Sequence, residues 1–183
     1  LTKTGDDLKA VQDNSMLLLY RLLFISYAES RGLLDTSNRY YHGMSLQEMK
    51  KEIATKLDAG DFLAPFSYAY WGKLNSLFDL INEGSESDRW RIDRKVFYIP
   101  AYNGGLFDPA KNTFLTTKHV SDPYLAEALD LLARSEKAMV DYSSLDIKHL
   151  GSIYEGLLEY KLTPDLNLLT DRGERRLTGS FYT

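Results

Sequence analysis

The stretch MLLLYRLLFISY, residues 16–27, is the most apolar part of the chain and decides its fold. Ten of these twelve residues are apolar, and Arg21 is the charged residue among them. The spacing of one helical face, steps of three and four, is followed by Leu8, Val11, Ser15, Leu18, Leu22 and Ile25. A membrane span needs about 20 apolar residues. We therefore predict a buried core helix over residues 6–32, which Gly32 ends in a left-handed conformation.

Composition is typical of an ordinary globular protein. The 183 residues are 44% hydrophobic and 26% charged, enough for one domain with a sizeable core. The absence of cysteine excludes disulfides and thiolate metal sites and fits a reducing compartment. Early charges such as Lys3 and Asp6 argue against a secretory signal. The formal net charge of −4 means that any nucleic-acid contact needs a local patch or further parts of the protein.

Helical signals recur along the rest of the chain. Ser45 and Glu48 form a capping-box pattern before a helix that ends at Gly60. A third helix is predicted over residues 65–82. Asp122-Pro123 is typical of an N-cap followed by proline in the first turn, and a further helix is expected from about Ser144.

Two regions are predicted to be extended, a β insert of two short strands and the C-terminal tail. Residues 95–100 are β-branched and aromatic, and residues 113–117 are expected to add a second short strand. The tail over residues 160–176 is interpreted as a hairpin. The predicted fold is thus mostly α, a multi-helix domain with a small β insert around residues 95–117 and an extended C-terminal hairpin. We expect a helical domain over residues 1–160 and an extended segment over residues 161–183.

Four motifs occur in the order found in one family of enzymes. They are YRLLFISYAESRGLL at residues 20–34, PAYNGGLF at 100–107, LGSIYEGLLEY at 150–160 and TGSFYT at 178–183. Together they resemble the region before the methyltransferase domain of type IIG restriction–modification enzymes and phage-defence N6-adenine DNA methyltransferases. Asp35 departs from the family, which often has proline there. In that family the last motif continues with a proline and opens the catalytic domain. The resemblance therefore implies a helical connector that precedes that domain.

The same resemblance implies a cofactor and a substrate for the parent enzyme. S-adenosylmethionine would be the cofactor, and its pocket would be lined in part by Gly179, Ser180, Phe181, Tyr182 and Thr183. Arg172, Arg175 and Arg176 are candidates for contact with DNA phosphates, and a solvated hairpin is the equal alternative for them. The glycine-rich strand–turn–helix and the (N/D/S)PP(Y/F) loop that grips a flipped adenine are both missing from the sequence. We therefore expect no complete active site, no catalytic residue, no metal and no bound cofactor in the chain itself.

The parent would be a cytoplasmic bacterial or archaeal protein, with no membrane contact. The connector would lie between a nuclease and the methyltransferase module, and magnesium would be required only where the parent carries the nuclease. Two alternatives stay open. The chain could be a free-standing helical protein-interaction module. It could also be a small metal-dependent nuclease built on Asp93 and Lys95 with Asp79 or Asp88, although such triplets arise by chance among 26 acidic and 22 basic residues.

Several polar and aromatic residues have a structural and a functional interpretation. Arg21, Glu29 and Arg31 lie on or near the most apolar stretch, and an interior ion pair is the favoured role for them. The pairs Tyr40-Tyr41 and Tyr70-Trp71 could stack on bases, but packing is favoured. Gly104-Gly105 is interpreted as a turn rather than a phosphate loop. The histidines, which show no metal-ligand spacing, are His42, His119 and His149.

Overall fold

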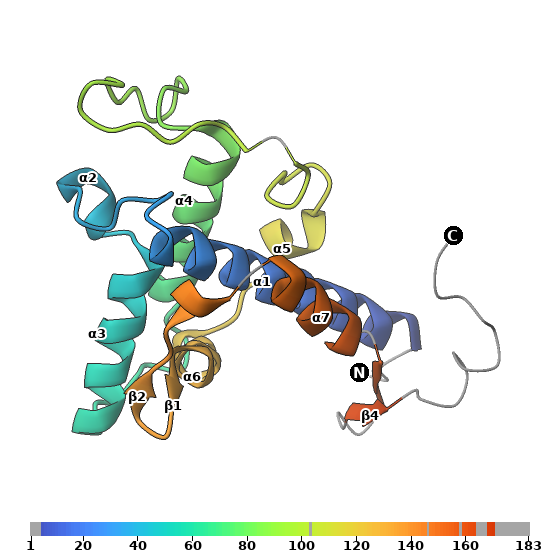
Figure 1. Ribbon diagram of the computed structural model, residues 1–183. Coiled ribbons are helices and arrows are strands. Elements are labelled where there is room, and N and C mark those ends of the chain that lie inside the picture. Colours follow the sequence, from blue (N-terminus) through green and yellow to red (C-terminus); the bar gives the residue numbers. More distant parts are fainter. Residues whose placement is uncertain (1–4, 103, 146, 158, 164–167, 171–183) are drawn as a thin grey trace. The chain divides into compact units, whose positions relative to one another are not determined.

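The structure is a computed structural model that describes residues 5–102, 104–145, 147–157, 159–163 and 168–170. Over these residues the chain forms seven α-helices, one short 3-10 helix and two antiparallel two-stranded hairpins (Figure 1). The predicted class, mostly α with a small β element, is confirmed.

The helices are α1 (Gly5–Ser30), α2 (Arg39–His42), α3 (Leu46–Ala59), α4 (Ala69–Glu83), α5 (Thr113–Thr117), α6 (Asp122–Ala133) and α7 (Ile147–Leu157), with the 3-10 helix η1 (Tyr142–Ser144). The strands are β1 (Arg134–Ser135), β2 (Ala138–Met139), β3 (Tyr160–Leu162) and β4 (Leu168–Thr170). In the registers, β1 pairs with β2 through Arg134 and Met139, and β3 pairs with β4 through Tyr160 and Thr170.

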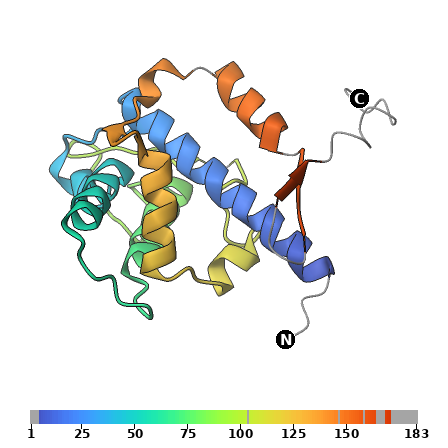
Figure 2. The same cartoon turned by 90° about the horizontal axis from the view of Figure 1, so that it is seen from below.

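The chain divides into two compact units. The central unit comprises residues 21–144, and the terminal unit comprises residues 1–20 together with 145–183. In the central unit, α6 packs against both α3 and α4 (Figure 2). The largest fully buried side chains of its core are Ile25, Leu34, Tyr41, Leu46, Ile53, Leu74, Leu77, Leu80, Ile81, Ile99, Leu125 and Leu129.

The predicted helix ends are confirmed at three glycine and serine positions. Ser45 is the N-cap of α3, and its Oγ accepts a hydrogen bond from the Glu48 amide at 3.2 Å. Gly60 ends that helix with a φ of 72°. Gly32 ends α1 with a φ of 68°, and the next two amides donate to the Ala28 carbonyl. Positive φ is the conformation that glycine adopts without the steric cost of a Cβ.

The predicted location of the β insert, residues 95–117, is wrong. Residues 95–100 pair with no strand, and residues 113–117 form α5. A single residue, Ser85, takes the place of a partner strand. Its amide donates to the Ile99 carbonyl at 2.9 Å, and its Oγ accepts from the Ile99 amide at 2.9 Å. These bonds satisfy the backbone amide and carbonyl of Ile99, while the side chains of Phe97 and Ile99 are buried in the core. A second strand is therefore not required to pair with these groups.

The terminal unit contains the β3–β4 hairpin, which confirms the hairpin predicted over residues 160–176 in its described part, residues 160–162 and 168–170. Residues 171–176 lie outside the described part of the chain. Gln12 of α1 binds the edge of β3. Its Oε1 accepts from the Leu162 amide at 2.9 Å, and its Nε2 donates to the Tyr160 carbonyl. A glutamine side chain thereby satisfies backbone groups at the edge of the hairpin.

The N-terminus of α4 is capped by a residue of another helix. Tyr68, at the N-cap position, makes no side-chain cap. The carboxylate of Asp122 instead accepts from the amides of Ala69 and Tyr70, at 3.2 and 3.0 Å, and from the Ser67 hydroxyl at 2.5 Å. The sequence-based role of Asp122 as N-cap of its own helix is therefore wrong. Ser121 occupies that position, and Asp122 joins α6 to α4.

We expect Asp122→Ala to lower the free energy of unfolding by about 1–3 kcal/mol, because it leaves three donors of the α4 start without an acceptor. Urea denaturation followed by circular dichroism measures the change. Ser121→Ala is the matched control, since the Ser121 side chain makes no cap bond, and its effect should stay within about 0.5 kcal/mol. Equal midpoints for the two variants would contradict the capping role.

Candidate functional site

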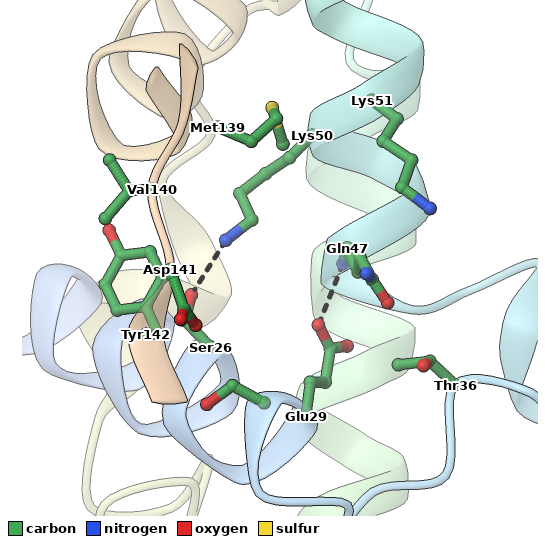
Figure 3. Close-up of a pocket in the computed structure, with 11 residues that line it drawn as sticks. Ser26, Glu29, Thr36, Gln47, Lys50, Lys51, Met139, Val140, Asp141 and Tyr142 are labelled. Carbon is green, nitrogen blue, oxygen red and sulfur yellow. Dashed lines mark hydrogen bonds between the residues drawn. The ribbon is translucent and has the colours of Figure 1, made fainter. Parts of the chain in front are cut away.

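A polar pocket of about 340 Å³ lies within the central unit, between α1, α3 and the segment that follows β2 (Figure 3). This volume is at the low end of the range for ligand sites. The pocket is lined by Ser26, Glu29, Ser30, Thr36, Gln47, Lys50, Lys51, Met139, Val140, Asp141 and Tyr142. Two of the lining residues, Glu29 and Lys50, are charged and buried, which makes the pocket the candidate functional site.

Glu29 is only 9% exposed and is held by three donors. Its carboxylate accepts from the amides of Leu46 and Gln47, at 2.7 and 2.8 Å, and from the Tyr41 hydroxyl at 2.7 Å. The two amides belong to the first turn of α3, whose positive end stabilises a carboxylate. Burial raises the pKa of Glu29 above its ordinary value, and the hydrogen bonds oppose that rise.

Lys50 is only 5% exposed and faces the same pocket from α3. Its Nζ donates to the Ser26 Oγ at 3.1 Å and lies 4.6 Å from the centroid of the Tyr142 ring. Burial lowers the pKa of the Lys50 ammonium, and the negative charge of Glu29 partly offsets that effect. The ion pairs within 4.0 Å that the described residues form do not include Lys50.

The other two charges of the pocket have partners of their own. Lys51 is exposed, and its Nζ pairs with Glu48 at 2.7 Å. Asp141 accepts hydrogen bonds from the amide and hydroxyl of Ser143, both at 2.8 Å, and these bonds, together with Arg31, lower its pKa. Lys50 is therefore the buried cation of the pocket, and within 4.0 Å it contacts no carboxylate among the described residues.

Tyr142 positions the aromatic wall of the pocket. Its hydroxyl donates to the Leu132 carbonyl at 2.5 Å. This bond holds the ring in place, and the Lys50 ammonium lies over the face of the ring. A cation over an aromatic face is attracted by the ring quadrupole, more strongly where both are desolvated. Met139 and Val140 continue this wall with apolar side chains.

Sequence reasoning overlooked Lys50, although a signal was present. Leu46 lies four residues before it, and Ile53 and Ala54 lie three and four residues after it. All three are buried. Because residues at these spacings share one face of a helix, the pattern places Lys50 on the buried face of α3.

The interior ion pair expected for Arg21, Glu29 and Arg31 does not form between Arg21 and Glu29. The Arg21 Nε donates to the Leu106 carbonyl at 2.8 Å, and its guanidinium lies 4.8 and 5.6 Å from the ring centroids of Phe78 and Phe107. Burial lowers the pKa of Arg21 to about 10, which the charge of Asp79 opposes. The buried guanidinium of Arg21 therefore contacts two aromatic rings and a backbone carbonyl instead of the carboxylate of Glu29.

The residues proposed for cofactor and DNA contact, 179–183 with Arg172, Arg175 and Arg176, lie outside the described part of the chain. Each suggested nuclease carboxylate has a partner among the described residues. Asp79 pairs with Arg89 at 2.6 Å, Asp88 pairs with Arg91 at 3.9 Å, and Asp93 accepts from the Lys95 amide at 2.8 Å. Among the described residues, no three His, Cys, Asp or Glu side chains gather in a way that could hold a metal ion.

The aromatic pairs Tyr40-Tyr41 and Tyr70-Trp71 mainly pack in the core. Tyr41, Tyr70 and Trp71 are buried, and of the four residues Tyr40 alone is exposed. The packing interpretation is therefore confirmed for three of them. Gly104 and Gly105 lie in a bend, and Gly105 has a positive φ of 77°. Asn112 Nδ2 donates to the carbonyls of Gly105 and Asp108 at 2.9 and 2.8 Å.

Comparisons with known families, curated proteins and solved structures found no match to this chain. Every helix in the described part of the chain is too short or too polar to span a membrane.

Replacing Glu29 by alanine should destabilise the protein by about 2–4 kcal/mol, because the change leaves two buried amides and the Tyr41 hydroxyl without an acceptor. The midpoint of urea denaturation measures the loss. The control is Glu48→Ala, which removes a partly exposed ion pair worth about 0–1 kcal/mol. A Glu29→Ala effect no larger than that of Glu48→Ala would contradict the capping role of Glu29.

The stability that depends on Glu29 should fall as the pH rises. The pKa of Glu29 is raised above 4.5 in the folded state, so between the two pKa values the folded protein binds more protons than the unfolded one. Stability therefore decreases with pH across this window. The observable is the free energy of unfolding of the wild type minus that of Glu29→Gln, measured at several pH values from about 4 upward. A difference that grows with pH would show that the hydrogen bonds outweigh the burial.

Proposed function

We propose that the chain is a helical scaffold that precedes the methyltransferase domain of a DNA-modifying defence enzyme and has no complete active site of its own. One observation carries the proposal: two of the motifs shared with that family pack against each other. Arg21 and Phe24 come from the first motif, and Leu106 and Phe107 come from the second. Arg21 donates to the Leu106 carbonyl, and the rings of Phe24 and Phe107 meet edge to face at 5.5 Å.

The role of the motif residues supports a scaffold rather than a catalyst. In the first motif, Arg21 and Glu29 satisfy groups of other segments of the central unit. In the second, Tyr102 also packs edge to face on Phe24 at 5.7 Å. Residues that fill a core and join segments keep a domain rigid, and a rigid connector is what the coupling of two catalytic modules requires.

The parent enzyme would supply the chemistry. It would bind S-adenosylmethionine and DNA, with residues 179–183 beside the cofactor and Arg172, Arg175 and Arg176 near DNA phosphates. Magnesium would be required only if the parent enzyme carries a nuclease module. The cytoplasm of a bacterium or archaeon is the proposed location.

A free-standing interaction module is the second candidate, and one surface feature favours it. Phe62 and Phe66, in the connection between α3 and α4, are 83% and 88% exposed. Large apolar side chains exposed close together in sequence are typical of protein-binding surfaces. The coding sequence after Thr183 separates the two candidates. A proline followed by a strand and a glycine-rich turn supports the scaffold of an enzyme, whereas a stop codon contradicts it.

The isolated chain should transfer no methyl group and cleave no DNA, because its sequence lacks the cofactor loop and the base-gripping loop. The product of the complete reading frame should transfer labelled methyl groups from S-adenosylmethionine to adenine in unmethylated DNA. Scintillation counting of the DNA measures transfer, and gel electrophoresis with and without magnesium measures cleavage. Methyl transfer by the 183 residues alone, or none by the complete product, would contradict the proposal. Magnesium-dependent nicking that Asp93→Ala abolishes would revive the nuclease hypothesis.

A further inference from the structure

The pocket beside Lys50 combines a buried cation with open space. The ammonium group has three N–H donors. One donates to the Ser26 hydroxyl, and the ring of Tyr142 faces the group. Neither partner carries a charge, and Glu29, the acidic residue that acts on Lys50, is held by three donors of its own. Among the described residues, at least one N–H of Lys50 therefore has no acceptor and remains for a ligand.

Burial makes such an acceptor favourable. A buried charge is costly unless it is paired or fully hydrogen-bonded. Lys50 forms no ion pair within 4.0 Å in the described part of the chain, yet a pocket of about 340 Å³ adjoins it. An anion that enters the pocket would complete the hydrogen bonding of the ammonium at a place where water screens the interaction poorly.

The acidic residues of the same pocket limit the charge of the ligand. Glu29 and Asp141 both line it, whereas Lys51, the second lysine of the lining, is exposed and already paired with Glu48. A ligand with two or more negative charges is therefore repelled by two carboxylates and gains little from Lys51. A monoanion gains the contact with Lys50 at a smaller electrostatic cost. A carboxylate fits this requirement better than a phosphate monoester, whose second ionisation near pH 6 makes it largely dianionic at neutral pH.

The remaining lining residues define the body of the ligand. Met139 and Val140 provide an apolar wall, and Thr36 and Gln47 provide polar groups opposite that wall (Figure 3). Ser30 also lines the pocket. We propose that this pocket binds a small monocarboxylate, whose carboxylate oxygen accepts a hydrogen bond from Lys50 Nζ and whose short aliphatic part packs on Met139 and Val140. This proposal does not depend on the proposed function of the chain.

The test is a titration of the isotope-labelled 183-residue chain with sodium butyrate, followed by NMR. Sodium sulfate at matched ionic strength is the dianionic comparison. The amide signals of Ser26, Lys50 and Tyr142 should shift and saturate with butyrate. Lys50→Met keeps an unbranched apolar side chain as far as Cε and removes the ammonium, and it should weaken binding about tenfold or more. Lys51→Met is the matched control on the same helix, since Lys51 is exposed and paired with Glu48, and its effect should stay below about twofold.

Three results would overturn the proposal: no saturable shift with butyrate, equal binding by wild type and Lys50→Met, or tighter binding of sulfate than of butyrate. Circular dichroism reports whether each variant is folded. If Lys50→Met does not fold, the wild type decides the matter. The side-chain Cε–Hε signals of Lys50 must then titrate with the same Kd as the amide signals, and an unchanged Lys50 side chain would reject the site.

Discussion

The central unit depends on one interaction, the binding of the first turn of α3 by the carboxylate of Glu29 near the end of α1. An α-helix begins with amides that have no partner in the helix, and the start of α3 is buried. Leu46, fully buried, donates its amide to Glu29, and so does Gln47. Tyr41 of α2 donates its hydroxyl to the same carboxylate. One side chain therefore joins three helices and satisfies groups that the solvent cannot reach.

A second carboxylate in this unit also caps the start of another helix. Asp122, in the first turn of α6, accepts from the amides of Ala69 and Tyr70 at the start of α4. In both cases the acceptor comes from another helix. Local caps position a helix end only relative to its own chain, whereas caps between helices also position one helix against another. The arrangement of α1, α3, α4 and α6 thus depends on two buried carboxylates as well as on apolar packing.

The candidate pocket follows from this arrangement. Because Glu29 holds the start of α3 against the end of α1, the next turn of α3 carries Lys50 into the interior beside Ser26. Tyr142, whose hydroxyl is held by Leu132, lies across the ammonium as an aromatic wall. The chain thereby encloses a positive charge with hydrogen-bonding capacity to spare, next to a cavity. A buried charge of this kind beside a cavity marks a candidate ligand site.

The sequence by itself determined the elements whose signals are local. The apolar run of residues 16–27, the Ser45 cap and the stops at Gly32 and Gly60 follow from spacing and backbone preference, which act within a few residues. Tertiary structure alone decided the features that join distant residues. Ser85 binds the extended backbone at Ile99 where a partner strand was expected. Asp122 caps α4 rather than its own helix. Arg21 contacts aromatic rings and a carbonyl rather than Glu29. The pocket belongs to this second group. Periodicity could place Lys50 on the buried face of α3, but the residues that meet its ammonium come from α1 and from the segment after β2, and only folding brings them together.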